Sequence, residues 1–118
     1  MKVKAEIIID ADRESVWRAF ENPDTLSQWQ PALTVTEWGK PGFIAGVHES
    51  ARSKAIVVYH FEVLDENSTQ VVVYAKHEFT GLRKLSSIFL RQAILHRTNE
   101  DLQCCKLLIE TEAAGSAR

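Results

Sequence analysis

The sequence predicts an α+β domain in which an antiparallel sheet of about five strands packs against one long C-terminal helix. Segments of alternating apolar and polar residues recur before residue 81, as in strands with one buried face. The two clearest segments, 55–64 and 69–80, flank the polar turn 65–68 and form an antiparallel hairpin. Residues 82–112 contain no glycine or proline and place apolar side chains at the period of a helix.

Length and composition indicate one ordinary globular domain. The chain has 118 residues, of which 45% are hydrophobic and 25% are charged. The net charge of −2 and the lack of a lysine or arginine run give no indication of nucleic-acid binding. No apolar run approaches the roughly 20 residues of a membrane span, and the N-terminus lacks the apolar core of a signal peptide. We therefore expect a single domain over residues 1–118, in the cytoplasm and without membrane contact.

The two cysteines are expected to be reduced thiols. Cys104 and Cys105 are adjacent on the predicted helix, where consecutive side chains diverge and cannot reach disulfide geometry. Cys105 continues the apolar stripe of the helix, which favours a small buried hydrophobic residue. A nucleophilic or redox role would need an activating neighbour, and the sequence shows none.

A strand and two short helices are predicted in the N-terminal part. Alternate positions of the first strand are apolar: Val3, Ala5, Ile7 and Ile9. Asp12 is a candidate N-cap for a helix that ends at Glu21. Asn22 and Pro23 then combine a capping side chain with the residue best tolerated in a first turn, and Pro31 ends this second helix. The inner faces of the helices carry large apolar residues: Val16, Trp17, Phe20, Leu26 and Trp29.

Two more strands complete the predicted sheet. They span 33–38 and 43–50, on either side of a turn that has glycine at both ends and a proline at its third position. At about 1.5 Å per residue, the helix over 82–112 reaches roughly 40 Å. It is therefore long enough for the whole sheet to lie across it.

Specific residues in this order resemble a known family. They are the stretch from Ile9 to Phe20, Asn22-Pro23-Asp24, the stretch from Leu26 to Pro31, Gly39-Lys40-Pro41-Gly42, the Phe79-Thr80-Gly81-Leu82 junction, and Asn99-Glu100-Asp101-Leu102 with Lys106. Together they resemble the polyketide cyclase/dehydrase branch of the START-like superfamily, also called SRPBCC. The resemblance covers nearly the whole chain and concerns residues that determine the fold, so it indicates architecture more strongly than chemistry.

The resemblance implies a helix-grip fold, in which a curved antiparallel sheet wraps around a long C-terminal helix and leaves a mainly apolar cavity. Family members bind lipids, sterols, polyketides or other hydrophobic small molecules. Some catalyse cyclisation, dehydration or hydrolysis in that cavity. The resemblance implies no cofactor.

The sequence departs from the family in one place. Relatives usually carry two more central strands between the turn 39–42 and the strand at 43–50, so we count five strands where the family has about seven. Loss of an interior pair is expected to remove part of the cavity wall and to leave the strands 33–38 and 43–50 with unpaired edges. We therefore expect a homodimer in which a second copy covers the exposed sheet edges.

The strand at 69–80 supplies the most informative polar residue. Its predicted inner face consists of Val71, Val73, Ala75, His77 and Phe79. His77 is polar among apolar neighbours and needs a partner, a water molecule or a ligand. Tyr59 on the neighbouring strand is a candidate partner, and the two are candidates for catalysis. The predicted ligand-binding residues are Trp29, Tyr59, Phe61, His77, Phe79, Leu85, Ile88 and Phe89.

No metal site or cofactor is expected. His48, His60 and His77 fall on strands, but His60 is out of phase with Tyr59 and Phe61, so the three histidines are not expected to share a face. The sequence contains no glycine-rich phosphate loop, nucleophile elbow or CxxC pair.

Three functions remain in competition. The first is a domain that binds a small hydrophobic or amphipathic molecule between sheet and helix. The second is a cyclase/dehydrase-like enzyme that uses His77 or Tyr59. The third is a cavity-poor member that acts through protein contacts as a dimer. A deep apolar pocket favours the first, a pocket with a polar group of perturbed pKa favours the second, and a filled interior favours the third.

Overall fold

The computed structural model describes residues 2–30, 32–50, 53–79 and 87–116. Its elements follow the predicted order: β1 (Lys2–Ile9), α1 (Arg13–Glu21), α2 (Pro23–Trp29), β2 (Leu33–Gly39), β3 (Phe43–Ser50), β4 (Ser53–Asp65), β5 (Ser68–Phe79) and α3 (Ser87–Ser116). The predicted α+β class and the predicted order of elements are confirmed.

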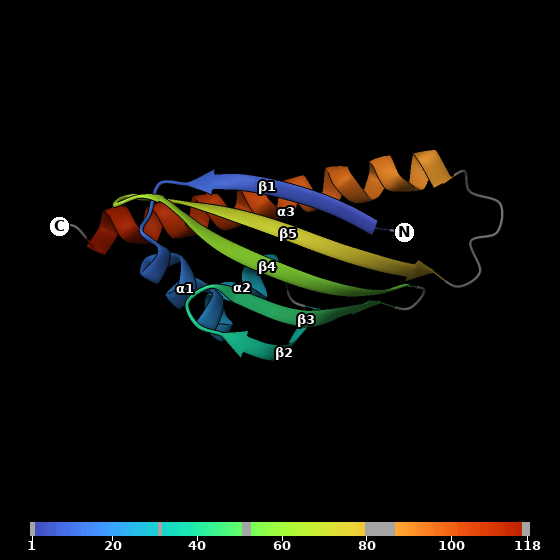
Figure 1. Ribbon diagram of the computed structural model, residues 1–118, viewed down its shortest axis with the longest axis horizontal. Helices are drawn as coiled ribbons and strands as arrows, with labels where there is room; N and C mark the ends of the chain where they lie inside the picture. The colour runs from blue at the N-terminus through green and yellow to red at the C-terminus, as the bar shows by residue number, and fades with distance from the viewer. Residues whose placement is uncertain (1, 31, 51–52, 80–86, 117–118) are drawn as a thin grey trace.

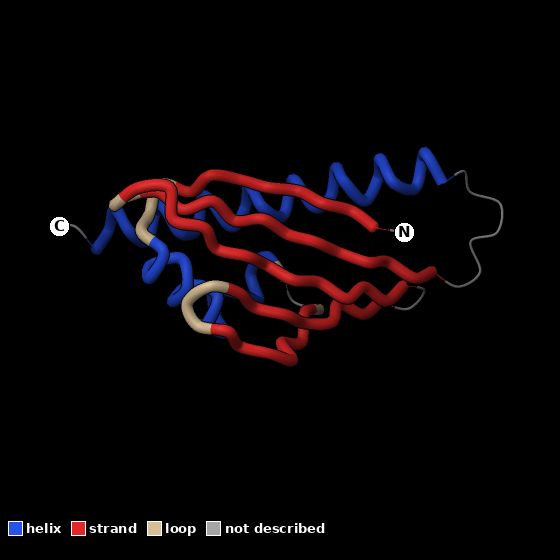
Figure 2. The backbone as a smooth tube through the Cα atoms, viewed as in Figure 1, coloured by secondary structure: helices blue, strands red, loops and turns tan. Residues whose placement is uncertain are grey.

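One antiparallel sheet forms the front layer of the molecule. Its strand order is β1-β5-β4-β3-β2, and α3 runs behind it (Figure 1). The helices α1 and α2 lie on the same side of the sheet as α3 (Figure 2). This arrangement is the helix-grip architecture that the family resemblance implies.

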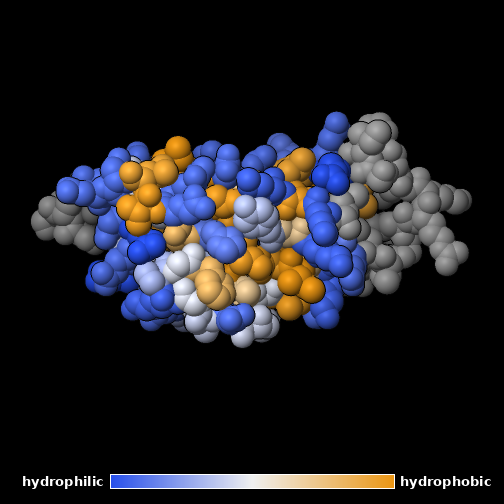
Figure 3. All heavy atoms as spheres, in the orientation of Figure 1, coloured by the Kyte–Doolittle hydropathy of each residue, from blue (hydrophilic) through white to orange (hydrophobic). Residues whose placement is uncertain are grey.

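None of the described helices covers the outer face of the sheet (Figure 1), which carries a mixture of charged and apolar residues (Figure 3). Figure 3 shows this face, with apolar patches between polar side chains. Ile56 and Tyr74 belong to it, and their side chains are 53% and 44% exposed. The core therefore lies on the other face, between the sheet and the three helices.

The start of α2 follows the predicted capping chemistry. The Asn22 side-chain oxygen accepts a hydrogen bond from the Asp24 backbone N–H at 3.0 Å, and Pro23 occupies the first turn, where its missing N–H costs nothing. Asp12 stands at the N-cap of α1 as predicted, but its carboxylate accepts from the Ser15 hydroxyl rather than from a backbone N–H of the helix.

An aromatic cluster joins the short helices to the sheet. The Phe20 ring centre lies 5.1 Å from that of Trp29, 5.2 Å from Tyr59 and 4.8 Å from Phe61. All four side chains are buried. Edge-on and tilted contacts of this kind add to the stabilisation from burial, so the cluster fixes α1 and α2 against β4.

The long helix α3 contributes its predicted apolar stripe. Leu102, Cys105 and Ile109 are almost fully buried. Burial raises the pKa of the Cys105 thiol, which suits the predicted hydrophobic role and not an activated nucleophile. The helix is described from Ser87, so its predicted start at 82 lies outside the described residues. Within the described part of the chain, no helix combines the length and apolarity needed to cross a membrane.

The two outer strands of the sheet are β1 and β2. The prediction that the strand at 43–50 has an unpaired edge is wrong, because β3 pairs with β2 on one side and with β4 on the other. The tight turn at 39–42, closed by a hydrogen bond from the Gly42 N–H to the Gly39 carbonyl at 2.8 Å, brings consecutive strands together as a hairpin.

The end of β1 is held by α3. Lys106 donates from its ammonium group to the Ile8 carbonyl at 2.8 Å, and Glu110 accepts from the Asp10 N–H at 3.0 Å. Lys106 and Glu110 thus serve as hydrogen-bond partners for backbone groups at the end of this outer strand.

Candidate functional site

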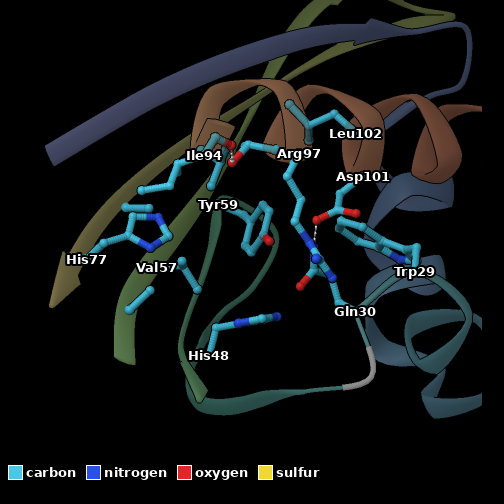
Figure 4. Close-up of a pocket in the computed structure, with 14 residues that line it drawn as sticks. Trp29, Gln30, His48, Val57, Tyr59, His77, Ile94, Arg97, Asp101 and Leu102 are labelled. Carbon is cyan, nitrogen blue, oxygen red and sulfur yellow. Dashed lines mark hydrogen bonds between the residues drawn. The ribbon is translucent and has the colours of Figure 1, made fainter. Parts of the chain in front are cut away.

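A cavity of about 250 Å³ lies between the inner face of the sheet and α3, beside the end of α2 (Figure 4). The interior is therefore not filled by side chains along this part of the helix. Strand registers and helical spacing determine which residues reach the cavity.

The floor is built from rows of residues on neighbouring strands. The β3–β4 and β4–β5 registers give the row His48–Ala55–His77, and the β4–β5 register gives the rows Val57–Ala75 and Tyr59–Val73. Ala55 and Ala75 both line the cavity, and their methyl side chains are the smallest in these rows. Two of the three rows therefore leave space above the sheet, which is why a cavity forms here.

The roof is one face of α3. Ile94, Arg97, Thr98, Asp101 and Leu102 line the cavity and recur at helical spacing. The Thr98 hydroxyl donates to the Ile94 carbonyl within the helix at 2.8 Å. Arg97 and Asp101 are therefore the polar groups that α3 offers to the cavity.

A hydrogen bond closes the side of the cavity next to α2. The Gln30 side-chain amide donates to the Asp101 carboxylate at 2.9 Å, and Gln30 itself is buried (Figure 4). Burial raises the pKa of the Asp101 carboxyl, while the hydrogen bond from Gln30 and the charge of Arg97 act in the opposite direction. This contact joins the end of α2 to α3.

Both histidines in the floor favour the neutral imidazole. Burial lowers the pKa of His77, and His48 lowers it further. Burial is also the main reason for the lowered pKa of His48, to which Arg97 adds, whereas Asp101 acts against it. Each ring therefore has both a donor and an acceptor nitrogen at neutral pH.

Tyr59 is a buried phenol. Its side chain is only 4% exposed, and burial raises its pKa, so it stays protonated and can donate a hydrogen bond. His77 is opposite Ala55 in the register, whereas Tyr59 is opposite Val73. The two candidate residues therefore line the same cavity in different rows.

The predicted ligand-binding residues divide into three groups. Trp29, Tyr59 and His77 line the cavity. Phe61 packs in the aromatic core instead, with ring centres 6.1 Å from Trp17 and 4.8 Å from Phe20. Leu85 lies outside the described residues, and so do the side chains of Phe79, Ile88 and Phe89. A role in ligand binding stays a prediction for every one of these residues.

Five polar lining residues were not predicted as ligand-binding residues: Gln30, His48, Arg97, Thr98 and Asp101. Strand alternation with the buried Ile44 would have placed His48 on the inner face. No sequence signal points to the contact between Gln30 and Asp101, because the two residues are 71 positions apart.

The third strand histidine lies on the other face of the sheet. The ring centre of His60 is 5.6 Å from that of Tyr74 and 6.3 Å from that of Phe43. The three histidines thus do not share one face: His48 and His77 lie on the inner face of the sheet, and His60 lies on the outer face. In the part of the chain that the structure describes, no group of three or more His, Cys, Asp or Glu residues is placed to hold a metal ion.

Comparison by sequence alone identifies no relative, because no protein-family model and no curated protein matches this chain. Comparison by structure finds proteins with a similar fold. A conserved protein from Geobacillus kaustophilus superposes with a TM-score of 0.80 at 14% identity, over 94% of this chain and 96% of that one. A START superfamily protein from Mycobacterium smegmatis gives a TM-score of 0.69 at 12% identity, over 94% and 95%.

An enzyme is also among the similar structures. Zhui aromatase/cyclase from Streptomyces sp. R1128 superposes with a TM-score of 0.56 at 14% identity, over 100% of this chain and 96% of that one. At these identities the likeness establishes the fold and leaves the activity open. The START-like fold predicted from the sequence is confirmed.

Proposed function

We propose that this protein binds a small hydrophobic or amphipathic molecule in the cavity between the sheet and α3. The cavity itself is the observation that carries the proposal. Its walls are mostly apolar and include a few polar groups, which is the usual composition of a small-molecule site. The START-like fold supports the proposal, since it places the cavity between the same two elements in the family that the sequence resembles.

The volume limits the ligand. An engineered apolar cavity of about 150 Å³ takes up benzene. A cavity of about 250 Å³ therefore has room for one or two fused rings, or for a short branched chain. A sterol or a long acyl chain would need more space than the described residues enclose.

A second candidate is general acid–base catalysis on such a ligand. His48 and His77 favour it, because a buried neutral imidazole beside a cavity can accept a proton at neutral pH. Tyr59 would then act as a hydrogen-bond donor. The aromatase/cyclase among the similar structures agrees with this candidate, which differs from simple binding in requiring turnover of the bound molecule.

The binding proposal is tested by filling the cavity. In Ala55→Leu, the larger side chain projects from the cavity floor. Ala45→Leu is the matched control, because Ala45 lies next to the inward-facing Ile44 and so points to the outer face of the sheet. Titration calorimetry with one- and two-ring aromatic compounds measures the affinity, and circular dichroism checks that both variants are folded.

We expect the unmodified protein and Ala45→Leu to bind the same compounds with similar affinity. Ala55→Leu should bind them at least about tenfold more weakly, because lost contacts of about 1.4 kcal/mol correspond to this factor. The proposal is wrong if no compound in this size range binds, or if the two variants lose affinity equally.

A further inference from the structure

Two histidines face the cavity across one small residue. His48 on β3 and His77 on β5 are both opposite Ala55 on β4. Strands lie about 4.8 Å apart, so the two backbone positions are roughly 10 Å from each other. Both rings stand beside the cavity, with no bulky side chain in the row between them (Figure 4). A flat molecule above Ala55 would have an imidazole at each end.

The charges around this row favour a ligand without net charge. Among the described lining residues, the formal charges at pH 7 are those of Arg97 and Asp101, which cancel. Asp101 is half-buried and held by Gln30, whereas Arg97 is exposed. The charge nearer the interior is thus negative, and a ligand carboxylate would lose its hydration beside it.

The hydrogen-bonding groups favour a ligand that carries hydroxyl groups. A neutral imidazole accepts at one ring nitrogen, and the Asp101 carboxylate also accepts. Hydroxyl groups can donate to these atoms and can accept from the Tyr59 phenol or from the other nitrogen of an imidazole. The apolar rows of the floor, Val57–Ala75 and Tyr59–Val73, suit the flat face of an aromatic ring.

We propose that the ligand is a neutral aromatic molecule of one or two rings with hydroxyl groups, which lies over Ala55 and hydrogen-bonds to His48 and His77. This inference rests on the proposed function, because it names the ligand class of the same cavity. Beyond the ligand class, we propose that His48 and His77 determine which ligands bind, because they recognise a neutral polar group on the ligand.

Three probes with the same ring system test the proposal: naphthalene, 2-naphthol and 2-naphthoic acid. They are titrated at neutral pH, where the alcohol is neutral and the acid is an anion, and their own fluorescence reports binding. We expect 2-naphthol to bind at least about tenfold more tightly than the other two probes, because its hydroxyl can donate a hydrogen bond to an imidazole nitrogen, which neither naphthalene nor the naphthoate anion can do.

At least one of the variants His48→Phe and His77→Phe should lose the preference for 2-naphthol over naphthalene while still binding naphthalene, because the single hydroxyl bonds to the imidazole at its own end of the molecule. The glutamine side chain keeps a hydrogen-bond donor and an acceptor, so His48→Gln and His77→Gln should retain part of the preference. These variants replace the phenylalanine variants in the test if the latter do not fold. His60→Phe is the matched control, because His60 packs against Tyr74 on the outer face, and its preference should equal that of the unmodified protein.

The outcomes separate the two proposals. Equal or tighter binding of 2-naphthoic acid would overturn the ligand class while the binding function stands. Equal binding of naphthalene and 2-naphthol, or an unchanged preference in the folded histidine variants, would remove the role of the histidines. If none of the three probes binds, both the ligand class and the proposed function fall.

Discussion

At the scale of single residues, His48 and His77 carry the most chemistry. Folding places two imidazoles on one face of the sheet, where burial lowers the pKa of each below the ordinary value of 6.5. On unfolding, both rings return to water and bind protons more readily. These residues therefore link stability to pH, whatever the cavity binds.

The sign of this linkage follows from the direction of the shifts. Because the unfolded chain binds protons at a higher pH than the folded protein, the two histidines leave stability intact above pH 6.5. Stability falls as the pH drops below 6.5 and through the lower pKa values of the folded state. The nearby groups are Asp101 and Arg97 for His48, and His48 for His77.

We therefore predict that the free energy of unfolding decreases between about pH 7 and pH 5, and that it decreases less in the double variant His48→Phe/His77→Phe. Urea denaturation at a series of pH values measures both curves. Asp101 titrates in both proteins, so its contribution largely cancels in the comparison. Parallel curves for the two proteins would contradict the prediction.

At the scale of elements, a glycine on β3 lets the two strands of the β2–β3 hairpin lie close together. A Cβ atom built on Gly46 would lie 2.7 Å from the carbonyl oxygen of Thr34 on β2. That oxygen belongs to the backbone of the neighbouring strand, so it cannot move away without displacing the strand. The absence of a side chain at Gly46 thus allows β2 to pair closely with β3.

We predict that Gly46→Ala destabilises the protein by about 1–3 kcal/mol, the usual cost of overpacking. Gly42→Ala is the matched control in the same hairpin, because its nearest atom would be 3.8 Å away. Urea denaturation of the two variants measures the difference. An equal loss in both would show that close approach to Thr34 is not the cause.

Local sequence signals predicted most element boundaries. Strand alternation placed β4 at 55–64, and the structure has Ser53–Asp65. The Asn22-Pro23 pair marked the start of α2, since capping and proline preference act within one turn. The edge prediction failed for β3 because pairing depends on how short turns bring strands together and not on the character of one strand.

At the scale of the whole molecule, β2 is the outer strand that could extend the sheet. It pairs with β3, and Thr36 falls at an irregularity in that register and has no partner residue on β3. The described part of α3 holds the end of β1, so the two outer strands differ. We propose that a second copy of the chain pairs along β2.

We predict a dimer by light scattering at micromolar concentration. Thr36→Pro should convert it to a monomer with an unchanged circular dichroism spectrum, because proline removes a backbone N–H from β2 at a residue without a Cα partner on β3. Thr36 contacts β3 through a hydrogen bond from its hydroxyl to the Ala45 carbonyl at 3.3 Å, on the exposed surface. A strictly monomeric unmodified protein would contradict the proposal. So would a variant that stays dimeric, since the interface would then lie elsewhere.

The sequence alone determined the fold class, the order of elements and the face on which His77 lies. These properties follow from the period of apolar residues and from caps and turns, which act over a few neighbouring residues. The resemblance to the START-like family added the expectation of a cavity between sheet and helix.

Only the tertiary structure decided which polar groups meet in that cavity. His48 joins His77 through the registers of two strand pairs, and Gln30 reaches Asp101 across 71 positions of sequence. Registers and helix placement are set by the packing of the whole core, and small side chains such as Ala55 leave space only where their neighbours do not fill it. No local pattern in the sequence encodes such a convergence of distant side chains.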